Sequence, residues 1–217
     1  MITLYHCNSA RSFRALWALE EMQLPYDLKM LPFPPRVHAK GYLALNPLGT
    51  IPLLIDGPTR MTESAAIGQY LADRYGPSPL AVSVNEPEFG AYLNWLHHGE
   101  ATLTFPQTLV LRYTRLEPPE RRLQQAAEDY KKWFLARTRA AEAALGKSEY
   151  LCAGRFTMAD ISVGYAFMLA HSLGMGAELT PNIAAYWARL TARAGHQRAL
   201  AAQALGAEQQ GIEVAGV

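Results

Sequence analysis

Two short motifs in the first third of the chain carry residue types suited to holding a small anionic peptide. The stretch Asn46-Pro47-Leu48-Gly49-Thr50-Ile51-Pro52 predicts a turn that enters a strand at a proline, where a strand tolerates one. A cis Ile51–Pro52 bond would leave the Ile51 backbone able to pair with an extended peptide. Glu63-Ser64 follow, and Ser64 opens a helix whose first amides lack partners. The two motifs together predict a site for a small, anionic, cysteine-containing peptide.

The elements that must position these motifs form a small α/β unit. Alternation and β-branched residues predict strands at 2–6, 26–30, 51–55 and 59–61. Apolar residues at helical spacing predict a helix that follows Cys7–Ala10 and ends before Pro25, a short one at 38–45, and one at 64–75. A helix between the first two strands indicates a βαβ unit with parallel pairing.

A different organisation begins after the breaker Gly76-Pro77-Ser78-Pro79. Strand signals vanish, and helical periodicity dominates the rest of the chain. We expect a first domain at 1–78, a linker at 79–87 and an all-helical domain at 88–217. An Ala-rich tail from Ala199 is expected to fray. The expected helices of this part lie at 89–104, 121–145, 158–173 and 182–194.

Composition narrows the class of protein. The 217 residues carry a formal charge of +1, which argues against a nucleic-acid surface. Cys7 and Cys152 lie far apart in the sequence, so neither a disulfide framework nor a metal-binding pair is expected. His97 and His98 are adjacent on a predicted helix and point in different directions, which makes a metal site improbable. With no export signal and no apolar run of roughly 20 residues, we expect a soluble, cytoplasmic protein without a membrane partner.

Three motifs, in order, resemble the glutathione S-transferase family over essentially the whole chain. Asn46–Pro52 matches its NPxGxxP signature, and Glu63–Asp73 matches its ES-x-A-I-x-x-YL segment. Leu151–Ile161 is similar to its GxxxTxADI segment, in which Thr157 and Asp160 form an acidic capping box with a structural role. The resemblance implies a thioredoxin-like glutathione-binding domain, an all-α C-terminal domain, and a serine-type, bacterial-like cytosolic class.

The family's reaction activates the glutathione thiol. A free thiol has a pKa of about 8.5, so only a few per cent is ionised at neutral pH. The resemblance places the activating group between the first strand and helix, and Ser9 is the candidate. It precedes Arg14 by five residues, as the active serine precedes an arginine in several serine-type classes. The other interpretation is that Ser9 only caps the helix.

Other residues of the same stretch stay open as activating groups. Ser12 is second to Ser9, although a place in the first helical turn would face it away from the site. Cys7 could be reactive, but a cysteine ending a buried strand is more often inert. Ala10 stands where the cysteine-type bacterial class has its catalytic cysteine, which argues against that mechanism. The remaining candidates are Tyr5, Asn8 and Arg11.

The resemblance also implies which residues bind glutathione, the co-substrate. The Ile51 backbone should pair with the cysteinyl part, and Ser64 should hold the γ-glutamyl carboxylate through its hydroxyl and amide. Glu63 should meet the γ-glutamyl amine. The glycyl carboxylate should be reached by His38 or Lys40. The implied set is therefore Ile51, Pro52, Glu63, Ser64, His38 and Lys40.

A second substrate should bind against the first long helices of the C-terminal part. The wall candidates are Phe105, Leu109, Arg112 and Tyr113, although an aromatic stripe is more often core. The implied function is a homodimeric, detoxifying glutathione transferase acting on a small, largely apolar electrophile, without a metal. Two other functions stay open: a non-catalytic binding or regulatory protein of the same fold, and a glutathione-dependent reductase or isomerase.

Overall fold

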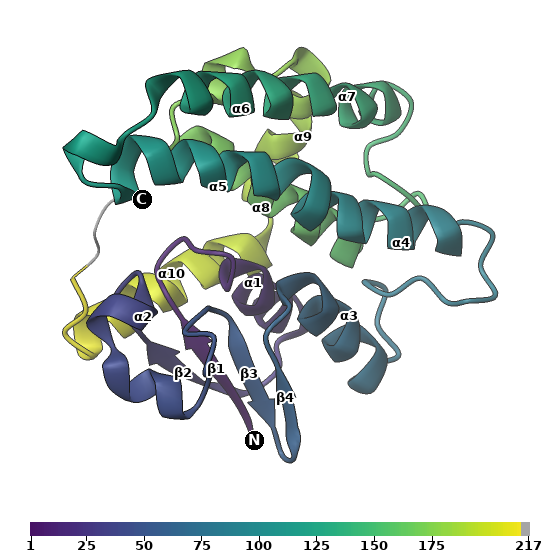
Figure 1. Ribbon diagram of the computed structural model, residues 1–217. Coiled ribbons are helices and arrows are strands. Elements are labelled where there is room, and N and C mark those ends of the chain that lie inside the picture. Colours follow the sequence, from purple (N-terminus) through teal and green to yellow (C-terminus); the bar gives the residue numbers. More distant parts are fainter. Residues whose placement is uncertain (214–217) are drawn as a thin grey trace. The chain divides into compact units, whose positions relative to one another are not determined.

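The computed structural model describes residues 1–213, and these group into two compact units (Figure 1). The first unit contains residues 1–81 and 191–213, and the second contains Val82–Leu190. This grouping differs from the single helical domain that the sequence predicts for 88–217. The structure instead returns the chain after residue 190 to the N-terminal unit, so the two domains are not separated by a single linker.

The first unit is built on a four-stranded mixed sheet in the order β2–β1–β3–β4. β1 (Ile2–His6) pairs in parallel with β2 (Tyr26–Met30) and antiparallel with β3 (Leu53–Asp56), which pairs antiparallel with β4 (Thr59–Met61). The expected βαβ unit is confirmed, with α1 (Phe13–Met22) as its crossover helix. β3 begins after Pro52 because a proline has no N–H to donate to the ladder.

Within residues 1–213, the first unit contains three helices that pack beside its sheet, and the last of them belongs to the segment expected to fray. α1, α3 (Ser64–Arg74) and α10 (Ala194–Gln209) lie together on one side of the sheet, and α1 contacts both of the others (Figure 1). A Cβ at Gly206 would lie 3.1 Å from Leu28 and Met30 of β2. The prediction of fraying from Ala199 was therefore wrong for the residues of α10, whose small side chains allow a close approach to the sheet, and residues 214–217 of the predicted tail lie outside the described residues. Two short helical segments precede β3, namely α2 (Pro35–His38) and η1 (Lys40–Ala44).

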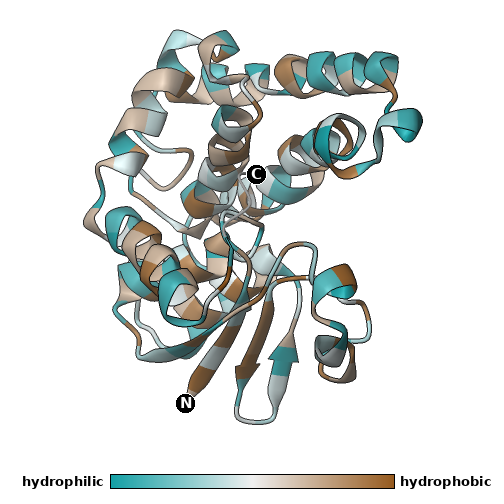
Figure 2. Cartoon of the chain, turned by 90° about the vertical axis from the view of Figure 1, so that its left-hand side faces the viewer, coloured by the Kyte–Doolittle hydropathy of each residue, from teal (hydrophilic) through white to brown (hydrophobic). Residues whose placement is uncertain are grey.

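The second unit is helical throughout its regular elements. Most helices carry both hydrophobic and hydrophilic residues along their length (Figure 2), as expected of amphipathic helices that bury one face. The predicted helix at 121–145 is divided near Thr138, and the predicted helix at 89–104 continues through π-helical turns into a further helix. The elements are α4 (Phe89–His97), η2 (His98–Thr104), α5 (Phe105–Leu111), η3 (Arg112–Leu116), η4 (Pro119–Arg121), α6 (Gln124–Arg137), α7 (Arg139–Leu145), α8 (Met158–Ser172), η5 (Gly176–Glu178) and α9 (Pro181–Thr191).

The centre of this unit is α8, which is buried almost all round. Gly99 lies directly against it, since a Cβ there would come within 2.5 Å of the Ser162 carbonyl carbon. The Ser162 hydroxyl donates to the Leu96 carbonyl oxygen at 2.6 Å, which anchors α8 to α4. None of the helices in residues 1–213 has the length and apolar character needed to cross a membrane.

The start of α8 confirms the capping box. The Thr157 hydroxyl accepts from the Ala159 N–H at 3.3 Å, and the Thr157 N–H donates to Asp160 Oδ2 at 2.8 Å. Asp160 Oδ1 accepts from the Leu151 N–H at 3.1 Å and from the Tyr186 hydroxyl at 2.8 Å. Burial raises the pKa of Asp160 to about 6, while these donors favour the ionised form. One carboxylate thus ties together the preceding loop, α8 and α9.

We expect Asp160→Asn to lower the free energy of unfolding by about 3 kcal/mol, since an amide NH₂ would face buried donors that now have an acceptor. Urea denaturation at pH 7.5, where the Asp160 carboxylate is ionised, measures the change. Asp129→Asn is the matched control, because Asp129 is exposed on α6 and should cost little. Equal stability of the two variants would contradict a structural role for the Asp160 carboxylate.

Candidate active site

The turn between β1 and α1 carries the residues expected to activate a thiol. It is closed by the Ala10 N–H, which donates to the Cys7 carbonyl at 3.2 Å, and by the Phe13 N–H, which donates to Ala10 at 2.8 Å. Helix α1 begins only at Phe13 and Ser12 occupies its N-cap position, so Ser9 lies outside the helix. Ser9 has a φ of +52°, in the left-handed region that residues other than glycine rarely occupy.

The Ser9 side chain is partly exposed and lies between two carboxamides. Its hydroxyl oxygen accepts from Asn8 Nδ2 at 3.3 Å and from Gln203 Nε2 at 3.4 Å. Its backbone N–H donates to Gln203 Oε1 at 3.0 Å. Gln203 belongs to α10, and nothing in its local sequence indicated that it would reach this turn.

Ser12 and Cys7 point into the protein interior. Ser12 is fully buried, and its oxygen lies 2.7 Å from His6 Nδ1 and accepts from the Cys7 N–H at 3.2 Å. Burial raises the pKa of the Cys7 thiol to about 12, so this thiol stays neutral at physiological pH. Tyr5 lies within β1 and its ring contacts that of Tyr42, with centroids 5.5 Å apart. Ser9 is thus the partly exposed hydroxyl of the turn.

The Asn46–Pro52 motif is held by its own asparagine. The buried Asn46 side chain donates to the Thr50 carbonyl oxygen at 2.8 Å and accepts from the Leu48 N–H at 3.2 Å. Gly49 has a φ of +60°, and a Cβ there would lie 2.6 Å from the Arg36 Cβ, so only glycine fits the turn. The Ile51–Pro52 peptide bond is cis. Within residues 1–213, no main-chain hydrogen bond joins the Ile51 backbone to another segment.

A buried arginine, Arg14, contacts the Glu63-Ser64 motif. Helix α3 starts at Ser64, with exposed Glu63 in the N-cap position. Ser64 is buried, and its hydroxyl accepts from Arg14 NH1 at 3.1 Å. Arg14 is only 1% exposed. A guanidinium beside a helix N-terminus adds positive charge where unpaired amides already favour an anion.

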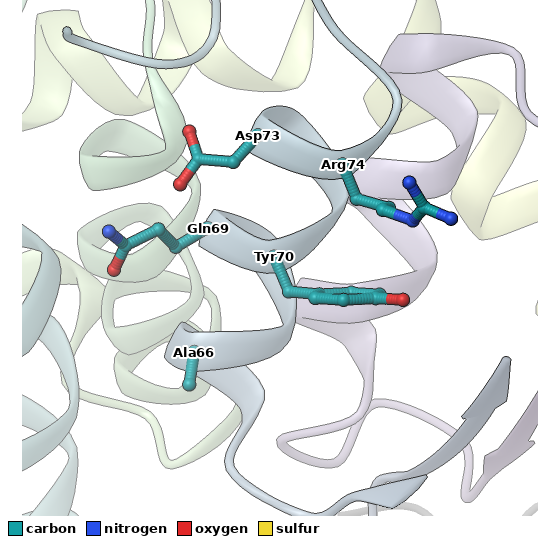
Figure 3. A pocket seen from close by; sticks show the side chains of 5 residues that line it. All are labelled: Ala66, Gln69, Tyr70, Asp73 and Arg74. Atoms are coloured by element: carbon teal, nitrogen blue, oxygen red, sulfur yellow. The ribbon is translucent and has the colours of Figure 1, made fainter. Parts of the chain in front are cut away.

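Two hollows open on the first unit. One, of about 490 Å³, contains Asn8 and His38 and is lined by Asn8, Leu31, Pro32, Phe33, His38, Gly211, Ile212 and Glu213. The other, of about 450 Å³, runs along α3 and contains none of the predicted site residues (Figure 3). There Tyr70 and Arg74 extend to one side of the helix, and Gln69 and Asp73 to the other. Lys40 is exposed and lines neither of these two hollows.

The second-substrate candidates share a face of the continuous helical stretch in the second unit. Phe105 and Leu109 lie on α5, and Arg112 and Tyr113 follow at the start of η3. Phe105 is 48% exposed, whereas the neighbouring Val110 is buried. Arg112 pairs with Glu117 at 2.8 Å, and its guanidinium lies 5.5 Å from the Tyr113 ring centroid.

The described residues offer no cluster of three or more His, Cys, Asp or Glu side chains arranged to hold a metal ion. His97 is exposed, whereas His98 lies edge-on to the Trp95 ring at 5.0 Å. The two adjacent histidines therefore face different surroundings.

Comparison with known proteins assigns the chain to a family. The family model described as "Glutathione S-transferase, N-terminal domain" matches residues 8–74. Glutathione S-transferase GstA of Escherichia coli O157:H7 is 31% identical over 169 residues, which span 76% of this chain and 79% of that protein. GstB of Escherichia coli K12 is 29% identical over 199 residues, or 89% of this chain and 94% of that protein.

A solved structure extends the likeness to the fold of nearly the whole chain. The glutathione transferase URE2P8 from Phanerochaete chrysosporium, determined with oxidized glutathione, has a TM-score of 0.82 at 21% identity. The alignment covers 98% of this chain and 97% of that one. The thioredoxin-like N-terminal domain and the helical C-terminal domain are therefore confirmed. With the curated relatives named as transferases, these matches show that the chain belongs to the glutathione S-transferase family and is a transferase enzyme.

Proposed function

We propose that this enzyme is a serine-type glutathione transferase in which Ser9 activates the thiol. The observation that carries the proposal is the contrast within one turn. Ser9 is partly exposed and held from two sides, whereas Ser12 is buried against His6 and the Cys7 thiol is kept neutral. Ser9 is the hydroxyl of this turn that a bound thiol can reach.

The proposed chemistry follows from hydrogen bonding to the ionised form. A donor directed at the sulfur favours the thiolate and lowers its pKa, so a larger fraction is ionised at neutral pH. The thiol proton leaves to solvent, and the Ser9 hydroxyl keeps its own hydrogen. The thiolate sulfur then supplies the electron pair for the new S–C bond to the electrophile. The leaving group departs with the electrons of the bond it breaks.

Glutathione itself is proposed to bind along the first unit. The Ile51 backbone, which lies outside the β3 ladder, would pair with the cysteinyl part. The γ-glutamyl carboxylate would meet the start of α3, where Ser64 and Arg14 lie together, and Glu63 would take its amine. His38 is a better candidate than Lys40 for the glycyl carboxylate, because it shares a hollow with Asn8.

The electrophile is proposed to be small and largely apolar, with Phe105, Leu109, Arg112 and Tyr113 as its wall. Support comes from their common helical face and from the 48% exposure of Phe105, an aromatic ring that the second unit does not bury. A homodimer with a detoxifying role in the cytoplasm is proposed from the family resemblance, and the solution mass measured by light scattering tests the dimer.

A cysteine-dependent reductase mechanism has little support at the site. Thiol–disulfide exchange requires a thiolate as the attacking group. Burial raises the pKa of Cys7 to about 12 and that of Cys152 to about 11, and both side chains are buried. We therefore assign no disulfide exchange to a cysteine of the protein, whereas a reductase or isomerase that uses the glutathione thiolate itself stays open as the alternative to transfer.

We expect Ser9→Ala to lower kcat/KM for conjugation of chlorodinitrobenzene about ten- to a hundredfold, the value of a hydrogen bond to a charged group. The apparent pKa in the pH profile should rise, since the thiolate loses a donor. Ser83→Ala is the control: Ser83 is exposed and lies outside the first unit, so this change should leave the apparent pKa in place. If Ser12→Ala or Cys7→Ala moves that pKa while Ser9→Ala does not, the assignment of Ser9 fails.

We expect Ser64→Ala to weaken glutathione binding about tenfold, because a charge-assisted contact to the γ-glutamyl carboxylate is lost. Isothermal titration calorimetry measures the dissociation constant. Ser83→Ala serves as the control, since Ser83 is exposed and lies outside the first unit. Unchanged affinity in Ser64→Ala would refute the site, and no binding by the intact protein would favour the non-catalytic function.

A further inference from the structure

Gln203, within α10, joins this helix to the turn that carries Ser9. It is buried, with 5% of its surface exposed. Its Oε1 lies 3.0 Å from the Ser9 backbone nitrogen and 3.1 Å from His6 Nε2, and its Nε2 lies 3.4 Å from the Ser9 hydroxyl oxygen. One carboxamide therefore contacts both the backbone and the side chain of Ser9.

The orientation of this carboxamide follows from its partners. A backbone N–H can only donate, so the atom that faces the Ser9 nitrogen must be the oxygen, Oε1. Burial lowers the pKa of His6 to about 4, so its ring is neutral and carries one hydrogen. That hydrogen lies on Nε2, which donates to Gln203 Oε1, while Nδ1 accepts from the Ser12 hydroxyl at 2.7 Å. The donor and the acceptor are then assigned for each hydrogen bond in the series Ser12–His6–Gln203–Ser9.

The remaining atom, Gln203 Nε2, can only donate to the Ser9 oxygen. Asn8 Nδ2 approaches the same oxygen at 3.3 Å, and it is also a donor. The Ser9 hydroxyl hydrogen must therefore point away from both carboxamides. The backbone of Ser9 is held as well, since a φ of +52° costs about 1–2 kcal/mol and the bond to Oε1 opposes its relaxation.

We propose that Gln203 is a positioning residue for the reaction: it fixes Ser9 in its left-handed conformation and directs the Ser9 hydroxyl hydrogen toward the bound sulfur. The inference rests on the proposed role of Ser9. Gln203 itself need not touch glutathione, because it acts through the serine. The nearly isosteric change Gln203→Met tests this, since it removes both the donor to the hydroxyl and the acceptor of the backbone N–H without adding charge.

We expect Gln203→Met to raise the apparent pKa of enzyme-bound glutathione by about one unit, and to lower kcat/KM at neutral pH about tenfold. Glutathione affinity at low pH, where the thiol is neutral, should change little. The ultraviolet absorbance of the thiolate in the binary complex and the pH profile of kcat/KM supply the two readouts. An unchanged pKa in a folded variant would overturn the proposal.

The chain offers a matched control at the end of the same helix. Gln210 accepts from the Met30 N–H at 2.9 Å and donates to the Leu28 carbonyl at 2.9 Å, so it ties α10 to β2. Gln210→Met removes two comparable hydrogen bonds that do not involve Ser9. It should lower thermal stability and leave the thiol pKa in place. If both variants raise the pKa equally, the effect is a general loosening of α10 and the inference fails.

A double-mutant cycle separates this inference from the role of Ser9. In the Ser9→Ala background, Gln203→Met should produce no further rise of the thiol pKa. If Ser9→Ala alone leaves the pKa unchanged, the proposed function fails. If Ser9→Ala raises it and Gln203→Met does not, only the positioning role fails. Equal effects of Gln203→Met in both backgrounds would show that Gln203 does not act through Ser9.

A second variant covers the case in which Gln203→Met does not fold. Gln203→Glu keeps an acceptor for His6 and for the Ser9 N–H, but it places a second acceptor beside the hydroxyl. Ser9 would then donate to the carboxylate instead of the sulfur, and the thiol pKa should rise further. Because a carboxylate also acts through its charge, the rise must be larger with Ser9 present than in Ser9→Ala. Equal rises would overturn the proposal.

Discussion

The packing of α10 against α1 and β2 is the constraint on which the first unit depends. Small residues allow the approach, since a Cβ at Gly206 would crowd Leu28 and Met30. Ion pairs reinforce it at the surface, where Arg193 binds Glu21 at 2.8 Å and Arg198 lies 3.1 Å from Glu20. This packing carries a polar side chain to the end of β1, so the last helix of the chain supplies part of the surroundings of its first turn.

The polar groups of this unit differ in charge between two places, the β1–α1 turn and the start of α3. At the β1–α1 turn, neutral groups predominate: a histidine whose pKa burial lowers to about 4, two carboxamides and two serines. Such uncharged groups can orient the Ser9 hydroxyl by hydrogen bonding, and they carry no net charge that would attract or repel a bound thiolate. At the start of α3, by contrast, a buried guanidinium lies beside a helix N-terminus. That combination suits a permanent anion such as a carboxylate.

Much of the fold could be predicted from local patterns. Alternating apolar residues and the break before Pro25 predicted the parallel βαβ unit, and the spacing of Thr157 and Asp160 predicted the capping box of α8. The grouping of domains could not be predicted in the same way. An Ala-rich segment such as 194–209 has no strong amphipathic pattern, so its helix depends on which surface it packs against. Only the tertiary contacts place it with the first unit.

The sequence by itself determined the family, the order of the elements in the α/β unit and the two motifs of the site, because turns, caps and glycine positions depend on neighbouring residues. Gly49, for example, stands in a turn motif read from the sequence, and its φ of +60° agrees with that turn. Only the tertiary structure decided which side chains surround Ser9 and Ser64. Arg14 reaches Ser64 across 50 residues, and Gln203 reaches Ser9 across 194. Contacts between residues so far apart in the sequence depend on how the helices pack on the sheet, and a local sequence pattern does not predict them.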